Sequence, residues 1–190
     1  MKPLLTLSIV AIALALVGCG GLSSSPKMDV TIGGKTNSYA IKDAKMMKLQ
    51  QGSGDNAKAQ YQIHLATFEL TETSDVSKPL TENGQAVISI EVYDKKGTTR
   101  DSVPTPTTFP AKSNNFAEAS FGSVFISYFE DGKLIRKTPA DFSADNKDKD
   151  GSVKFNSVSG ETVTGEADLK ITDKITLKGN FTAKIVGKEF

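Results

Sequence analysis

The C-terminal part of the chain alternates between apolar and polar residues, and this pattern predicts β-strands. One segment carries apolar side chains at Ile175, Leu177, Phe181, Ala183 and Ile185. The segment before it carries them at Val163, Ala167, Leu169 and Ile171. A period of two places one face of each strand on a core and the other in water. The short connection 172–174 between the two segments indicates a β-hairpin.

A third strand is expected to begin near Val153 and Phe155 and to end at Ser159-Gly160, so the three segments form a meander. Residues 61–65 and 86–92 alternate in the same way. After Ala66-Thr67 the apolar phase shifts to Phe68 and Leu70, and a slip of this kind predicts a β-bulge.

Residues 121–129 are apolar or small on both phases, which predicts a central strand covered on both faces. Asp131-Gly132 follows and predicts a two-residue hairpin turn, because both turn positions need positive φ. Between 40 and 50 the apolar residues Ile41, Ala44 and Met47 fit a short helix as well as a strand, and the pattern leaves both open.

The segments 51–58, 71–85 and 103–110 are polar or rich in proline and predict exposed loops. No charge run, repeat or low-complexity block divides residues 28–190. We therefore expect one all-β domain, either a single antiparallel β-sandwich or a closed β-barrel of about eight to ten strands.

The N-terminal segment differs from the rest of the chain. After Lys2, an apolar run of about 14 residues ends at Val17, which is short for a bilayer core of roughly 30 Å. It predicts a secretory signal peptide over residues 1–18. Leu16-Val17-Gly18-Cys19 resembles the lipobox of bacterial lipoproteins. The resemblance implies that Cys19 becomes the mature N-terminus, with diacylglycerol on its sulfur and an acyl chain such as palmitate on its amine; the alternative is a chance cysteine beside an ordinary cleavage site.

Lipid on Cys19 would determine where the protein resides. Two or more lipid chains hold a protein stably on a membrane. Gly20 follows the cysteine, and in the lipoproteins that this segment resembles, the absence of aspartate there favours the outer membrane where the cell has one. Residues 19–27 are rich in Gly and Ser and form the expected flexible tether. We expect a lipid-anchored protein of the cell envelope.

The charge balance and the cysteine content limit the partners and the chemistry that we expect for this chain. The chain has 23 Lys and Arg and 22 Asp and Glu, and loss of residues 1–18 removes Lys2 alone, leaving 22 of each sign. A balanced charge provides no broad basic field for nucleic acid, so we expect no nucleic-acid partner. Once Cys19 is lipidated, no thiol remains for a disulfide, a metal or catalysis.

One segment has the spacing of a metal site. Asn146, Asp148 and Asp150 precede Gly151 as the ligands at positions 1, 3 and 5 precede the glycine of a calcium loop. Position 12 is Ser157 instead of glutamate, and two lysines lie inside the loop, so a solvated turn is the favoured interpretation. Calcium at these three residues is a weak candidate, and no cofactor is predicted.

His64 is the only histidine and takes the polar phase beside Gln62, so it is expected to face solvent. A single histidine without a second His or Cys does not make a typical zinc or copper site. The chain contains no G-x-S-x-G, P-loop or G-x-G-x-x-G motif. We predict no catalytic residues and no enzymatic activity; an envelope hydrolase, the third alternative, would need a polar cleft that contains His64 or a pair of acids.

Phe121, Phe125 and Phe129 are expected in the core, although a hollow barrel could use them to line a cavity for a small hydrophobic ligand, as lipocalin-like carriers do. The segments 151–170 and 175–186 resemble the glycine-punctuated ending G-x-V…v-x-G-x-x-d-l…l-x-G-x-F-x-A of many small all-β bacterial lipoproteins. Similar strands occur in surface-exposed lipoproteins that bind host factors. The sequence thus predicts a non-enzymatic binding or envelope-structural role, with a protein partner or, alternatively, a small hydrophobic ligand.

Overall fold

The computed structural model describes residues 25–71, 73–113, 115, 117–138 and 149–187, and these form an all-β structure. Its strands are β1 (Lys27–Ile32), β2 (Lys35–Ala40), β3 (Asp43–Gln51), β4 (Lys58–Ala66), β5 (Ala86–Tyr93), β6 (Thr107–Pro110), β7 (Ser120–Glu130), β8 (Lys133–Lys137), β9 (Asp150–Ser159), β10 (Thr162–Thr172) and β11 (Ile175–Val186). Two short 3₁₀ turns, η1 (Gly54–Asn56) and η2 (Thr73–Val76), lie in the connections.

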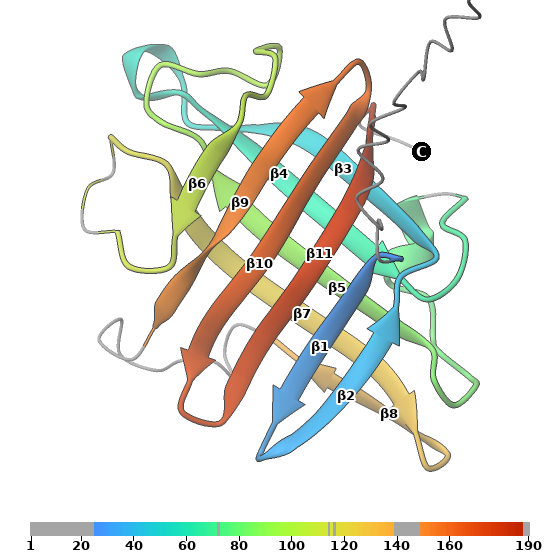
Figure 1. Ribbon diagram of the computed structural model, residues 1–190. Helices are drawn as coiled ribbons and strands as arrows, with labels where there is room; N and C mark the ends of the chain where they lie inside the picture. The colour runs from blue at the N-terminus through green and yellow to red at the C-terminus, as the bar shows by residue number, and fades with distance from the viewer. Residues whose placement is uncertain (1–24, 72, 114, 116, 139–148, 188–190) are drawn as a thin grey trace, which may run out of the picture.

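The eleven strands belong to one mixed sheet in the order β6-β9-β10-β11-β3-β4-β5-β7-β8, and β1 pairs with β11 and β2. Figure 1 shows this sheet as two layers of strands that cross obliquely, with β9, β10, β11, β1 and β2 in front of β3, β4, β5 and β7. The sheet is not closed, because within the described residues β2, β6 and β8 each have a strand on one side only.

Strand β11 connects the two layers. Its first half, up to Asn180, pairs antiparallel with β1, whereas Lys184–Val186 pair with Lys45–Met47 of β3 in parallel. The expectation of a purely antiparallel sheet is therefore wrong at this one junction. A twelve-residue strand extends beyond the six-residue β1, and its far end becomes available to the other layer.

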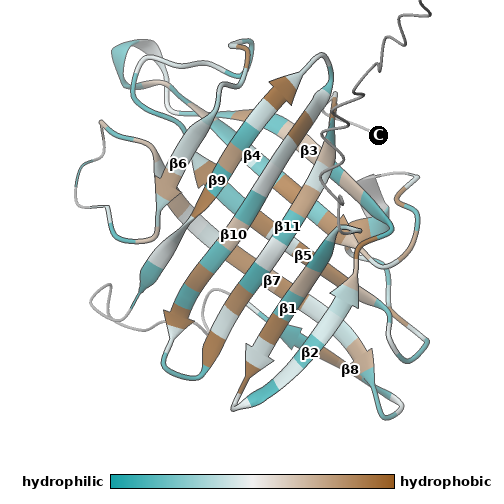
Figure 2. Cartoon of the chain, in the orientation of Figure 1, coloured by the Kyte–Doolittle hydropathy of each residue, from teal (hydrophilic) through white to brown (hydrophobic). Residues whose placement is uncertain are grey.

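Side chains from both layers fill the space between them. The ring of Tyr61 on β4 lies 5.5 Å from that of Phe155 on β9, and Phe109 on β6 lies 4.8 Å from Phe155. Phe155 also meets Phe181 on β11 edge to face at 6.4 Å. Such tilted and edge-to-face pairs are the favourable ring arrangements. The interior between β4 and β9 is thus packed with aromatic rings, and Figure 2 shows the alternation of hydrophobic and hydrophilic residues along the strands.

Two glycines of the C-terminal ending lie where a side chain would not fit. A Cβ atom on Gly165 would lie 2.4 Å from the Lys154 carbonyl oxygen and 2.4 Å from the Phe181 ring. One on Gly179 would lie 2.0 Å from the Lys27 carbonyl oxygen, where β1 crosses close to β11. Glycine permits this close approach of backbones. The glycine-punctuated pattern is therefore a packing requirement of the sheet.

The C-terminal strands agree with the sequence prediction. β9, β10 and β11 form the predicted meander, with Val163 opposite Ala183 and Leu169 opposite Leu177. The predicted hairpin turn between β7 and β8 is confirmed as well, since Asp131 and Gly132 have φ values of 51° and 74°.

The sequence pattern left residues 40–50 open between a helix and a strand, and in the structure residues 43–51 are strand β3, whose residues Ala44 and Met46 are buried in the core. Two other expectations are wrong. The proline-rich segment 103–110 is not entirely a loop, since Thr107–Pro110 form β6 and Phe109 is fully buried. The described residues form eleven strands, where about eight to ten were expected.

The bulge expected at Ala66-Thr67 is absent. β4 pairs in continuous register with β3 and β5 and ends at Ala66. The chain then leaves the sheet, and Leu70 packs with Ala66, Leu80 and Val87 in a second, smaller cluster. The shift in apolar phase therefore marks a loop that folds back over the outside of the sheet.

A bulge occurs in β7 instead. Glu91 pairs with Ser123 and Val92 with Phe121, so Gly122 is the extra residue. The bulge places Phe121 on the buried side, whereas Phe125 faces outward and is 45% exposed. Phe121 is thus a core residue as expected, but Phe125 is not, and β7 is not covered on both faces at Phe125.

Cys19, the signal segment 1–18 and most of the tether 19–27 lie outside the described residues, and β1 already begins at Lys27. Asn146 and Asp148 of the calcium candidate lie outside them as well. Among the residues that are described, no helix is long and apolar enough to cross a membrane.

Candidate functional site

Two hollows on the surface bring together side chains that can bind a ligand. The first, the β2 cleft, has a volume of about 740 Å³. It is lined by residues 36–40 of β2, the loop residues 82–85, the residues 129–131 at the end of β7, and Lys42, Thr67 and Phe68. This cleft lies at the open side of the sheet, between the edge strand of one layer and the end of a strand in the other.

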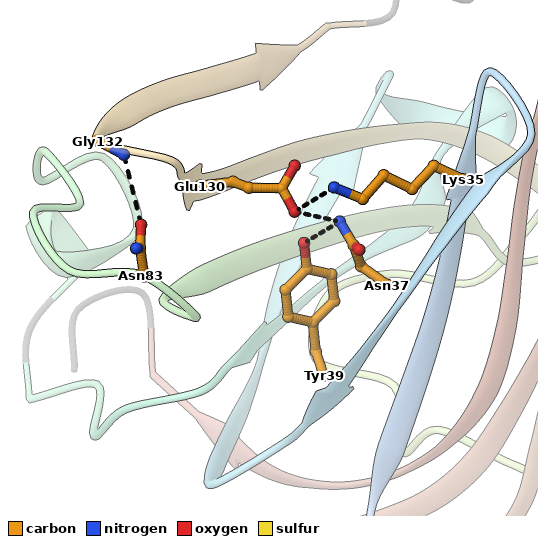
Figure 3. A network of polar contacts seen from close by, with 6 residues as sticks. All are labelled: Lys35, Asn37, Tyr39, Asn83, Glu130 and Gly132. Atoms are coloured by element: carbon orange, nitrogen blue, oxygen red, sulfur yellow. Dashed lines mark hydrogen bonds and ion pairs between the residues drawn. The ribbon is translucent and has the colours of Figure 1, made fainter.

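A cross-layer network holds the β2 side of this cleft (Figure 3). Lys35 Nζ lies 2.8 Å from Glu130 Oε1, and Asn37 Nδ2 donates to the same oxygen at 3.3 Å. Asn37 Nδ2 also lies 3.4 Å from the Tyr39 hydroxyl oxygen. The ring of Tyr39 lies 6.2 Å from that of Tyr128 on β7. Burial raises the pKa of Tyr39 to about 12, so its hydroxyl stays neutral.

The backbone of β2 presents hydrogen-bonding groups to the cleft. The Ile41 N–H donates to the Pro26 carbonyl at 2.9 Å. Because hydrogen-bonded pairs recur at every second residue, the odd-numbered residues of β2 direct their N–H and C=O groups to β1. In an antiparallel ladder the intervening residues point their N–H and C=O groups away from the partner. Thr36, Ser38 and Ala40 therefore direct theirs outward, and none of these N–H groups donates to another residue in the described part of the chain.

The other two edge strands carry features that discourage pairing. β6 has four residues and ends in Pro110. In β8 three of five residues are basic, namely Lys133, Arg136 and Lys137. Prolines, charges and short length are the usual protections of a sheet edge. β2 has six residues and a single charge at its start, so it is the least protected edge.

The second hollow, the His64 pocket, has a volume of about 310 Å³ and lies on the outer face of β4, β5, β7 and β8. Its floor is formed by Gln62, His64, Ser89 and Ser127, and its walls include Phe125, Arg136, Glu91 and the loop residues 76–78. The loop that follows β4 makes the pocket, because Val76 packs on the small cluster beside the outer face.

The expectation of an exposed His64 is wrong. His64 does lie on the outer face, as its phase predicts, but it is only 5% exposed. Its Nδ1 lies 2.8 Å from Ser89 Oγ on the neighbouring strand. Burial lowers the pKa of His64 to about 4, so the imidazole is neutral at pH 7. Sequence alternation gives the face of a residue but not what covers that face.

The contact between Ser89 and His64 resembles one half of a hydrolytic site, but its surroundings favour binding. A serine nucleophile needs backbone or side-chain donors for the developing oxyanion. β5 pairs with β4 on one side and β7 on the other, so the ladders engage the backbone groups around Ser89. A neutral imidazole and a hydroxyl in a small pocket are equally suited to hydrogen-bond a ligand.

A third polar group lies inside the fold, at the start of β4. Lys58 is 1% exposed, and its Nζ donates to the Glu118 carbonyl at 3.0 Å. The Tyr61 hydroxyl donates to Asp94 Oδ2 at 3.0 Å. Burial lowers the pKa of Lys58 below its ordinary value, and the nearby Asp94 offsets part of this effect. These contacts satisfy buried polar atoms and hold Asp94 and the backbone at Glu118 against β4, which is a structural role.

The calcium candidate gains no support from the residues that are described. Asp150 begins β9, and its Oδ1 accepts a hydrogen bond from the Gly151 N–H at 2.9 Å. In the parts of the chain that the structure covers, no group of three or more His, Cys, Asp or Glu residues is arranged to hold a metal ion.

Sequence reasoning missed Arg136 and Ser127, although the turn could have indicated them. A two-residue turn at 131–132 places 127 opposite 136, and the structure has this pair. It also missed the β2 cleft, for which the sequence contains no local signal, because the cleft joins residues 36–40 to residues 129–131.

No family model, curated protein or solved structure matches this chain.

Proposed function

We propose that the chain is a lipid-anchored protein of the cell envelope that binds an extended segment of a partner protein at β2, without catalysing a reaction. The observation that carries the binding role is the unprotected edge of β2 beside a cleft of about 740 Å³. The lipobox-like segment at Leu16–Cys19 supports the anchoring. We infer that the domain works as an open two-layered scaffold, closer to a sandwich than to a closed barrel.

The geometry of β2 fits strand addition. An extended peptide can pair with an exposed edge through main-chain hydrogen bonds, while pockets beside the edge select its side chains. Thr36, Ser38 and Ala40 offer three outward pairs of N–H and C=O groups. The partly buried rings of Phe68 and Phe129 give the same cleft an apolar wall.

Charge favours a basic segment. The cleft is lined by three carboxylates, Glu82, Glu130 and Asp131, and by one lysine, Lys42. Lys35 pairs with Glu130 beside the cleft, so three carboxylates stand against two lysines there. An excess of carboxylates attracts cationic side chains and repels acidic ones. We therefore expect the partner segment to carry Lys or Arg on the side that faces the loop 82–85 and the β7–β8 turn.

The test uses two ten-residue peptides, one alternating Thr with Lys and the other alternating Thr with Glu, titrated into the full-length chain by calorimetry. We expect the basic peptide to bind at least about tenfold more tightly than the acidic peptide, a difference of roughly 1.4 kcal/mol. Absence of binding by the basic peptide, or equal binding of both, would overturn the proposal.

Two substitutions at one position separate strand addition from general attraction. Ser38→Pro removes one outward N–H without removing a ladder bond to β1, and proline is tolerated at a sheet edge for this reason. Ser38→Ala removes the same hydroxyl, which contacts Asp29, but keeps the N–H. We expect Ser38→Pro to weaken binding about tenfold and Ser38→Ala to leave it nearly unchanged. Equal effects of the two variants would show that the β2 backbone does not bind the peptide.

A further inference from the structure

We infer that the His64 pocket is a second binding site, specific for a small organic anion with a flat apolar part. This inference is independent of the proposed binding at β2, because the two hollows share no lining residue. The pocket volume of about 310 Å³ falls at the lower end of the range for small-molecule sites.

The first argument is an arginine available to a ligand. Arg136 on β8 is exposed, and no ion pair joins it to any residue that the structure describes. The guanidinium group binds a carboxylate through two parallel hydrogen bonds. Ser127, its partner across the ladder, lies in the same pocket and adds a hydroxyl donor next to it. A cation and a neighbouring hydroxyl make a site for an anionic group.

The second argument is an aromatic ring that the fold leaves uncovered. Phe125 is 45% exposed and is the one aromatic residue among the three exposed large hydrophobic residues in the described part of the chain. It alternates with the buried Val124 and Ile126, so it faces outward, and it lines the pocket two residues before Ser127 on the same strand. A flat apolar group on the ligand could stack on this ring while its charged group reaches Arg136.

The third argument is the polar floor beneath these two residues. His64 is only 5% exposed, and it lines the pocket together with Ser89. Ser89 Oγ and His64 Nδ1 form a hydrogen bond of 2.8 Å, and the low pKa of His64 leaves this pair uncharged at pH 7. Glu91, the acid of the pocket, accepts hydrogen bonds from Tyr93 and Ser123 and lies two rows from Arg136. The anionic end of the ligand therefore has its place at Arg136.

The test compares two ligands of similar size and opposite charge, benzoate and benzylamine, with the full-length chain. Binding is followed by calorimetry and by NMR shifts of the Phe125 and Ser127 amides. We expect benzoate to bind with a dissociation constant of roughly millimolar, the range for so small a ligand. We expect benzylamine to bind at least about tenfold more weakly. Equal binding, stronger binding of benzylamine, or no benzoate shifts at these amides would overturn the inference.

Matched variants locate the site. Arg136→Gln keeps a polar side chain that can hydrogen-bond but removes the charge and the guanidinium group, and Phe125→Ser removes the ring; each should weaken benzoate binding about tenfold. The chain has one other arginine, Arg100, which lies in a loop beside Asp101. Arg100→Gln should leave benzoate binding unchanged. If Arg136→Gln binds benzoate as the unchanged chain does while remaining folded by circular dichroism, the proposed site is wrong.

Discussion

At the scale of single residues, His64 is expected to make the stability of the protein depend on pH. The pKa of His64 is about 4 in the folded state, against an ordinary value of 6.5, because burial disfavours the imidazolium ion. Between these two values the unfolded chain binds more protons than the folded one, so the free energy of unfolding falls as the pH falls from about 6.5 to 4. A shift of this size corresponds to a loss of up to about 3 kcal/mol.

The measurement is urea unfolding at several values between pH 4 and 7, for the unchanged chain and for His64→Gln. Glutamine is polar but does not titrate, so the variant should lose less stability over this range. Both proteins share the contributions of their carboxylates, and the difference between their slopes therefore isolates His64. Parallel pH dependences would show that His64 is not kept neutral by its surroundings.

His64 also shows what a residue pattern can predict about a site. The alternation of residues 61–65 correctly places His64 on the face opposite to Ile63 and Leu65. His64 is nevertheless only 5% exposed, and residues 76–78, which follow it in sequence, line the same pocket. An alternation with a period of two predicts which face of the sheet a side chain lies on, but not whether another segment covers that face. The predicted face of His64 was therefore right and its predicted exposure wrong.

At the scale of strands, we expect aromatic packing between β2 and β7 to stabilise the fold more than the ion pair between them does. Lys35 and Glu130 form an exposed ion pair across the two layers, and such pairs contribute little. Tyr39 is 6% exposed and packs on Tyr128. Tyr39→Ala should therefore lower the free energy of unfolding by about 3 kcal/mol, as is typical of a buried aromatic side chain replaced by alanine.

The matched change is Lys35→Ala, which removes the ion pair and should leave the urea midpoint close to that of the unchanged chain. Both variants are measured by urea unfolding at pH 7 under the same salt conditions. If Lys35→Ala destabilised the protein as much as Tyr39→Ala, the layers would be joined by electrostatics and the interpretation of the network would be wrong.

The strands differ in how well their sequences predict them. β10 and β11 are long, alternate regularly and are joined by a short turn, so local pattern alone predicted their pairing. β3 was ambiguous because Ile41, Ala44 and Met47 also have helical spacing, and its neighbours β4 and β11 decide the outcome. β6 was missed because Pro110 and its flanking threonines resemble a loop, while Phe109 owes its burial to β9 and to Tyr61 on β4.

At the scale of the whole molecule, the sequence predicts an all-β fold but not how the sheet is arranged. Strand β11 pairs with both β1 and β3: Leu177 lies opposite Val30, and Ile185 lies opposite Met46. Pairing over such separations leaves no local trace in the composition. The open edge at β2 is a consequence of that arrangement, and so is the cleft on which the proposed function rests.

The anchoring proposal leads to the last prediction. Residues 20–26 join Cys19 to β1, and fully extended they reach about 25 Å, so the domain would remain close to the membrane surface. Cys19→Ala removes the site of lipid attachment, and each buried methylene of the lipid contributes about 0.8 kcal/mol. We expect this variant to move from the membrane pellet to the soluble fraction after cell lysis.

Ser23→Ala is the matched control, because it changes the tether but not the lipobox-like segment, and it should stay in the pellet. A wash with carbonate distinguishes lipid anchoring from loose surface binding, and the unchanged chain should resist it. If Cys19→Ala remained in the washed pellet, another part of the chain would hold the protein on the membrane. The lipid on Cys19 would then no longer place β2 close to the membrane surface. A partner protein on the same membrane would no longer be favoured over a partner in solution.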